Sequence, residues 1–244
     1  MSQQEWAHRA PPGVPCGQDF DVHANWQAIA ACVRAALRAA GADGADVAAV
    51  STTSMREGIV LYDFLYDAVG SDIWACPNVD SRASVEAAEL ISMGAAQRIY
   101  AEVGDWVSST PPARLRWLAR HRPHILREAR SLSMLSDWIT YRLARALATE
   151  PSCGSNSGMF SLVDRSWSES IAPNCALPVS VLPPVVDPGT IVGSVTAEAQ
   201  RRPDCGQVRR WSQAVRTPSS GCSAPGCVQA SSPCRPGRSG RTQC

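Results

Sequence analysis

The chain has 244 residues, 45% of them hydrophobic and 18% charged, which suffices for one large or two modest domains with a proper core. All 23 basic residues are arginine, and the lack of lysine excludes a P-loop, which binds phosphate through a lysine. The net charge of +1 is unevenly spread, because residues 1–200 carry 15 Arg and 21 acidic residues while residues 201–244 carry 8 Arg and one.

No apolar run approaches the roughly 18 residues of a membrane span, and the N-terminal residues lack the basic-then-apolar layout of a signal peptide. We therefore expect a cytoplasmic protein with no membrane partner. In that compartment the irregularly spaced cysteines of residues 1–196 are typical of buried thiols rather than disulfides. They are Cys16, Cys32, Cys76, Cys153 and Cys175.

The predicted elements alternate between helices and strands. Residues 1–24 are polar and rich in Pro and Gly, so they form an irregular lead-in. Residues 25–40 place apolar side chains on one helical face, and Gly41 predicts the end of that helix. Short apolar runs between turn residues predict three strands, over residues 46–55, 58–63 and 72–77. The later periodic segments predict helices over residues 81–101, 111–121 and 133–147.

The C-terminal part of the chain differs from this α/β body. Residues 182–195 form an extended segment, and beyond residue 200 there is no Leu, Ile, Phe, Met or Tyr. Such a stretch cannot bury a core and is expected to be disordered. Its arginines lack interleaved aromatics apart from Trp211, and its cysteine spacings match no zinc pattern. We therefore predict no nucleic-acid partner and no metal in this tail.

The densest polar cluster follows the first predicted strand and ends in Arg56 and Glu57. An arginine fork can bind two oxygens of a polyhydroxylated ligand, and a neighbouring carboxylate can accept from a hydroxyl. A solvated turn with a surface ion pair explains the same residues. From the spacing alone, the solvated turn is the favoured interpretation.

A second polar group, Asn78, Asp80 and Arg82, follows the third predicted strand. Alternation points these side chains the same way until the next helix begins. Asp80 also fits the N-cap of that helix, and from the residues alone this is its favoured role. Residues 152–157 form a third group, a small-residue loop whose amides either face a ligand or make ordinary turns. The four histidines have no metal-ligand spacing. The tryptophans on apolar faces are predicted to lie in the core: Trp74, Trp106, Trp117 and Trp138.

Six ordered motifs together resemble the FGGY family of carbohydrate kinases. They read SMREGIVLYD, IWACPNVDSRA, ARLRWLARHRP, MLSDWITYRL, PSCGSNSGMF and LPPVVDPGTIVGSVT. The resemblance runs from about residue 5 to residue 196, and within the family it is greatest to the autoinducer-2 kinase branch and weaker to the xylulokinase branch. It implies a ribonuclease-H-like (actin-like ATPase) N-terminal domain facing a second domain that holds ATP and Mg²⁺.

The resemblance also implies a function, the ATP-dependent phosphorylation of a hydroxyl on a small open-chain polyol or keto sugar such as autoinducer-2 or xylulose. Arg56 and Glu57 match the family's substrate-binding pair, and Asn78, Asp80 and Arg82 match the strand-end motif beside it. Asp137 and Trp138 match a helix expected to support the domain. The competing hypothesis is a non-catalytic sugar-binding or regulatory protein that uses the same pocket.

Two motifs of the family are missing from the sequence as written. The Asp-x-Gly-Thr phosphate-binding turn does not precede the first motif, and the Gly-Gly-x-Asp segment that carries the catalytic base does not follow Thr196. We therefore expect an incomplete, inactive domain and assign no catalytic residue, cofactor-binding residue or metal ligand to this chain. ATP and Mg²⁺ are assigned to the family alone.

The tail offers a reason for the second absence. When GC-rich codons for residues 203–244 are read in the neighbouring frame, one permitted translation contains TGLRPGAAVVTGGADTQ, which resembles the missing family segment. We infer a frameshift near residues 197–202. The predicted organisation is thus an N-terminal kinase domain lacking its first hairpin, over residues 1–196, and a frameshifted, disordered tail over residues 197–244.

Overall fold

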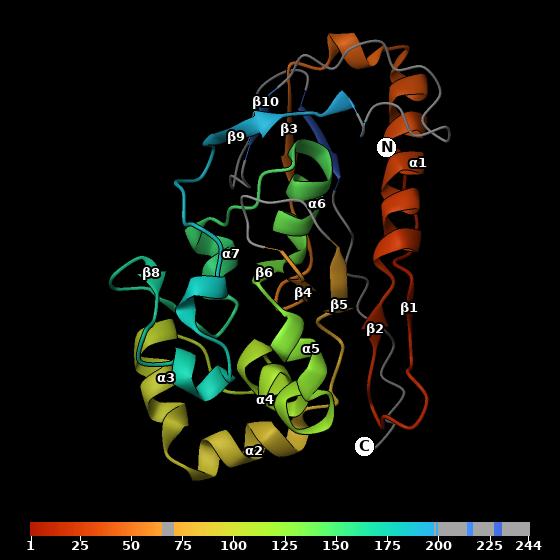
Figure 1. Ribbon diagram of the computed structural model, residues 1–244. Helices are drawn as coiled ribbons and strands as arrows, with labels where there is room; N and C mark the ends of the chain where they lie inside the picture. Colours follow the sequence, from red (N-terminus) through yellow and green to blue (C-terminus); the bar gives the residue numbers. More distant parts are fainter. Residues whose placement is uncertain (65–70, 198, 200–213, 217–226, 231–244) are drawn as a thin grey trace.

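The computed structural model describes residues 1–64, 71–197, 199, 214–216 and 227–230 (Figure 1). The helices are α1 (Val22–Ala40), α2 (Ser84–Ser92), α3 (Ala95–Val103), α4 (Pro111–His121), α5 (Pro123–Glu128), α6 (Leu135–Ala144) and α7 (Pro151–Ser155). The strands are β1 (His8–Arg9), β2 (Asp19–Phe20), β3 (Ala49–Thr52), β4 (Ile59–Tyr62), β5 (Asp72–Cys76), β6 (Ser131–Met134), β7 (Phe160–Ser161), β8 (Ser166–Trp167), β9 (Ile191–Ser194), β10 (Ala214–Arg216) and β11 (Cys227–Ala230). Short 3-10 turns occur at Gly44–Asp46, Ala172–Cys175 and Val179–Val181.

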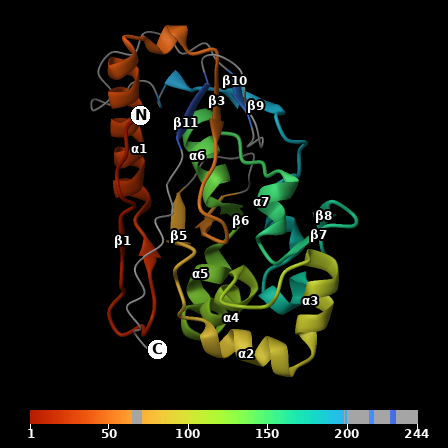
Figure 2. The ribbon, with the colours of Figure 1, turned by 180° about the vertical axis from the view of Figure 1, so that it is seen from behind.

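The helix predicted from periodicity over residues 25–40 is confirmed as α1, and the structure shows where it begins. The Asp21 carboxylate accepts from the amide of Ala24 at 2.9 Å and caps α1, which begins at Val22, three residues before the predicted start. Gly41 ends the helix in the left-handed region at φ +62°. Figure 2 shows α1 running along one side of the molecule, with β1 and β2 continuing from it.

The central sheet has the order β5-β4-β6 and is antiparallel throughout. All four residues of β4 are buried, as expected for the middle strand. The predicted strands 46–55, 58–63 and 72–77 are confirmed as β3, β4 and β5. β6 was not predicted, because residues 133–147 were assigned to one helix; Ser131–Met134 instead pairs with β4, and α6 begins at Leu135.

A second sheet has the order β11-β3-β10-β9. β3 pairs in parallel with both β10 and β11, and β10 pairs antiparallel with β9. Two short pieces of the tail therefore lie in this sheet. Apart from residues 197 and 199, the rest of the predicted disordered tail lies outside the described residues, and the division at residue 196 stays a prediction.

The helix predicted over residues 81–101 is two helices in the structure. Gly94 takes the left-handed conformation at φ +74° between α2 and α3, where a residue without a Cβ is favoured. Figure 1 shows α2, α4 and α5 gathered at the end of the molecule opposite β9 and β10. The helix predicted over residues 111–121 is confirmed as α4.

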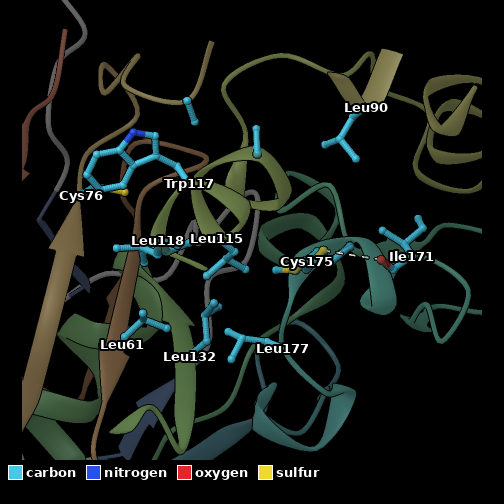
Figure 3. Packing of buried hydrophobic residues seen from close by; sticks show 14 of the residues in the cluster. Leu61, Cys76, Leu90, Leu115, Trp117, Leu118, Leu132, Ile171, Cys175 and Leu177 are labelled. Carbon is cyan, nitrogen blue, oxygen red and sulfur yellow. Dashed lines mark hydrogen bonds between the residues drawn. The ribbon is translucent and has the colours of Figure 1, made fainter. Parts of the chain in front are cut away.

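The largest core lies between these helices and the central sheet. Figure 3 shows Leu115 and Leu118 of α4 facing Leu61 of β4 and Leu132 of β6. Burying this apolar surface fixes α4 against the sheet. A neighbouring group of buried residues comes from the segment that follows β8, and consists of Ile171, Cys175 and Leu177.

Three of the four tryptophans predicted to lie in the core do so, namely Trp74, Trp117 and Trp138. Trp138 is fully buried and meets Phe20 edge-on, with the ring centroids 5.4 Å apart. The prediction for Trp106 was wrong, because 53% of this residue is exposed. It pairs with the exposed Tyr100 at a centroid distance of 5.2 Å instead of entering the core.

Within the described part of the chain, the five cysteines predicted to be thiols form no disulfide with one another. Cys76 and Cys175 are buried, and the other three are partly buried. Burial raises the pKa of Cys76 to about 11 and that of Cys175 to about 12. These two thiols remain protonated and unreactive near neutral pH.

Candidate functional site

The two predicted polar groups meet at one edge of the central sheet. β4 and β5 are antiparallel, and Ile59 at the start of β4 pairs with Cys76 at the end of β5. Residues 56–57 precede the first of these strands and residues 78–82 follow the second. Their shared position is therefore a direct consequence of the strand pairing.

Arg56 is exposed and is held from a distant part of the chain. Its Nη1 donates to Oδ1 of Asn156 at 3.2 Å. Asn156 follows α7, in the small-residue loop that the sequence marked as the third polar group. The structure therefore brings this loop beside the Arg56–Glu57 pair.

Glu57 is half-buried and adopts a positive φ of +63°, which is uncommon for a residue with a Cβ. Burial raises the pKa of its carboxyl, while the charge of Arg114 lowers it and that of Asp105 raises it. A carboxylate in this setting can accept a hydrogen bond from a ligand hydroxyl. An unfavourable backbone conformation at such a point is typical of functional sites.

Asp80 and Arg82 lie deeper and form a buried ion pair. Nε of Arg82 donates to Oδ1 of Asp80 at 2.7 Å, and both side chains have no exposed surface. The same Asp80 oxygen accepts from the amide of Gln18 at 2.7 Å. The N-cap interpretation of Asp80 is wrong, because the N-cap of α2 is Ala83 and no side chain caps that helix.

Arg82 is further enclosed on both faces. Its guanidinium carbon lies 5.2 Å from the ring centroid of Trp74 and 5.2 Å from that of Trp117. Its Nη2 donates to Oδ1 of Asp19 at 2.6 Å. These contacts anchor the segment after β5 to the N-terminal lead-in, while Asn78 remains partly exposed. The predicted sugar contacts of Asn78, Asp80 and Arg82 stay predictions.

Two buried carboxylates support the loops around the site. Glu150 caps α7 by accepting from the amides of Ser152 and Cys153, both at 2.8 Å. Asp137, at the start of α6, accepts from the amide of Met134 at 3.3 Å. Its burial beside Trp138 agrees with the supporting role expected for this helix.

Arg114 is the main residue of the site that the sequence did not indicate. It lies on α4 and donates to the carbonyls of Glu57, Asn78 and Asp80. Nothing local distinguishes it, because it shares an amphipathic helix with Arg116 and Arg120. Only the folded arrangement brings it to the edge of the sheet.

The described residues contain no group of three or more His, Cys, Asp or Glu side chains that could hold a metal ion. Within the same residues, no helix combines the length and apolar character needed to cross a membrane.

Comparison with solved structures identifies the class of fold. A ligand-bound xylulose kinase from Lactobacillus acidophilus matches with a TM-score of 0.75 and 16% identity, over 87% of this chain and 41% of that one. A xylulose kinase from Rhodospirillum rubrum matches with a TM-score of 0.71 and 20% identity, over 92% of this chain and 42% of that one. The fold is the actin-like ATPase fold of such kinases, as predicted.

Sequence comparison then gives the family. The model of the FGGY family of carbohydrate kinases, N-terminal domain, matches residues 6–203. The autoinducer-2 kinase of Yersinia pseudotuberculosis serotype O:3 is 41% identical over 207 residues, which are 84% of this chain and 38% of that relative. That of Yersinia pestis bv. Antiqua (strain Angola) is 42% identical with the same coverage.

The chain belongs to the FGGY family of carbohydrate kinases, as its motifs predicted. It spans about two fifths of the length of these curated relatives.

Proposed function

We propose that this chain forms the sugar-binding side of a kinase that phosphorylates a hydroxyl of an open-chain polyol or keto sugar. The observation that carries the proposal is the Arg56–Glu57 pair at the edge of the central sheet. Arg56 is exposed and its guanidinium donates to Asn156, whereas Glu57 is half-buried and its backbone carbonyl accepts from Arg114.

The chemistry of the pair suits a polyol. A guanidinium donates to vicinal hydroxyl oxygens in a planar fork, and an ionised carboxylate accepts the hydroxyl protons. Because the pKa of Glu57 is raised by burial, its acceptor capacity should decline at a higher pH than that of an exposed glutamate. Sugar binding should therefore weaken on acidification.

For the substrate we favour autoinducer-2 over xylulose. The support is the 41% identity with relatives named autoinducer-2 kinase, compared with 20% or less for the xylulose kinases among the structural neighbours. Both molecules offer adjacent oxygens to Arg56 and Glu57, so discrimination depends on the shape of the rest of the site.

ATP would supply the transferred phosphoryl group, and this reaction depends mainly on positioning and electrostatic stabilisation. Within that scheme the described residues bind and orient the sugar. We assign neither a base for the attacking hydroxyl nor a nucleotide contact to any of them. The frameshift inferred for the tail is part of this proposal.

Calorimetric titration of the chain with autoinducer-2, xylulose, xylitol and ribitol tests the proposal. We expect saturable heat with at least one of these probes, and a loss of about tenfold or more in affinity for Glu57→Gln. Glu128→Gln, which neutralises an exposed carboxylate on α5, is the matched control and should bind like the unchanged chain.

Absence of binding to all four probes, or equal affinity of the two variants, would refute the proposed site. Addition of ATP to a chain that binds a sugar tests whether this chain transfers a phosphoryl group on its own. Saturable binding of the sugar with no release of ADP is the result expected for an incomplete kinase domain, and also for a non-catalytic sugar-binding protein. Formation of a sugar phosphate would overturn both.

A further inference from the structure

We propose that Arg114 is a positioning residue of the sugar site, which holds the loop carrying Glu57 and the loop carrying Asn78 in fixed register. We call the set of bonds from Arg114 to these two loops the clamp. Its effect on sugar binding rests on the proposed function, whereas the clamp itself is a property of the fold. Arg114 does not need to touch the sugar, and its action would pass through the backbone of the residues that do.

The geometry of the clamp is unusually complete. Nη1 of Arg114 donates to the Glu57 carbonyl at 2.6 Å, and Nη2 donates to the carbonyls of Asn78 and Asp80, both at 2.8 Å. Nε lies 3.2 Å from the same Asp80 carbonyl. All three guanidinium nitrogens therefore bond to backbone that lies 34 to 57 residues away in sequence.

The clamp needs a guanidinium and not merely a positive charge. Its planar fork presents five donors in fixed directions, whereas a lysine ammonium is a compact point charge. The Arg114 side chain is only 1% exposed, so its charge must be balanced inside the protein. Oδ2 of Asp80 lies 3.4 Å from Nε and provides that balance.

The contact with Glu57 matters because of the backbone there. At φ +63° a residue with a Cβ is strained, so this conformation persists only where contacts favour it. The Arg114 bond to the Glu57 carbonyl is such a contact, and the bond from the Gly58 amide to the Arg56 carbonyl at 2.8 Å closes the turn. Loss of the clamp should let the turn relax and displace the carboxylate.

Arg114→Lys is the first test, with Arg120→Lys as the matched control. Arg120 lies on the same helix but bonds to Glu89 and Glu86 instead of the site loops. Amide hydrogen exchange, measured by NMR on the whole chain, should become about tenfold or more faster at Gly58 and Asp80 in Arg114→Lys. Both amides bond within the clamped turns. Arg120→Lys should leave both rates unchanged.

Binding of the calorimetric probes supplies the second readout. Arg114→Lys and Glu57→Gln should each weaken sugar binding about tenfold, and the double variant should be little weaker than either. That non-additivity would show that Arg114 and Glu57 act on sugar binding through the same interaction. Independent effects would instead multiply to about a hundredfold, and this result would overturn the positioning role.

The two readouts separate the ways in which the inference can fail. If the unchanged chain binds none of the probes, the proposed function fails, and amide exchange still decides whether the clamp exists. Exchange that is no faster at Gly58 and Asp80 in Arg114→Lys overturns the clamp. Arg114→Gln, which can still donate to one carbonyl, provides a second variant. Global unfolding of both Arg114→Lys and Arg114→Gln would overturn a role confined to the site.

Discussion

Replacing Asp137 by asparagine should remove a pH dependence from the stability of this fold. The Asp137 side chain is fully buried at the start of α6, and burial raises the pKa of its carboxyl from 3.8 to about 7. The charge of nearby Glu150 raises it further, while the hydrogen bond from the Met134 amide lowers it. The folded chain therefore binds a proton at this site over a range in which the unfolded chain has already released it.

The sign of the effect follows from that difference. Stability contributed by protonated Asp137 is fully present below about pH 4 and is lost as the pH rises through about 7. A difference of about 3 between the two pKa values corresponds to roughly 4 kcal/mol, which is an upper limit for the free energy lost. An asparagine side chain at this position would carry no charge at any pH, so the variant should lack this loss.

Urea unfolding at about pH 5, about pH 6.5 and about pH 8 measures the effect. The free energy of unfolding of the unchanged chain should fall relative to that of Asp137→Asn as the pH rises. Glu169→Gln neutralises an exposed carboxylate and should follow the unchanged chain. If the curves of the unchanged chain and Asp137→Asn run parallel over this range, the carboxyl is ionised in the folded state and the reasoning is wrong.

Two further substitutions test the packing around the site. Trp138→Ala should lower the free energy of unfolding in urea by about 3–5 kcal/mol, because the ring is fully buried against Phe20; a loss no larger than that of the exposed Trp106→Ala would contradict this. Gly58→Ala should cost about 1–3 kcal/mol in thermal unfolding, since its Cβ would lie 2.4 Å from Leu135 Cδ1 and 3.2 Å from the Cys76 carbonyl. A cost below about 0.5 kcal/mol, typical of an uncrowded surface position, would refute the steric argument.

Elements specified by local chemistry could be predicted from the sequence. The helix α1 has its stop at Gly41, and α4 has prolines in its first turn, so each boundary is encoded within a few residues. β6 was missed because Ser131–Met134 is fixed by pairing with β4, about 70 residues earlier, which a local pattern does not reveal. Tertiary pairing overrides helical periodicity in such segments.

In the candidate site, likewise, some features could be predicted from local sequence patterns and others only from the fold. Residues 56–57 and 78–82 each adjoin a strand that the sequence predicts, so their placement at a sheet edge follows from hairpin pairing. The residues that hold them are far away in sequence. Arg114 lies 57 positions from Glu57, and Asn156 lies 100 positions from Arg56. No spacing rule connects residues so far apart, and only the packed fold identifies these contacts.

The adjacent residues Arg56 and Glu57 are held by two separate segments, and this separation has a consequence for the site. Arg114 on α4 fixes the Glu57 backbone, whereas Asn156, which follows α7, accepts from the Arg56 guanidinium. Since Glu150 caps α7, its loss should loosen Asn156 and affect Arg56 first. Changes in α4 should instead affect Glu57 first. The acceptor and the donor of the pair can thus be weakened independently, although they are neighbours in sequence.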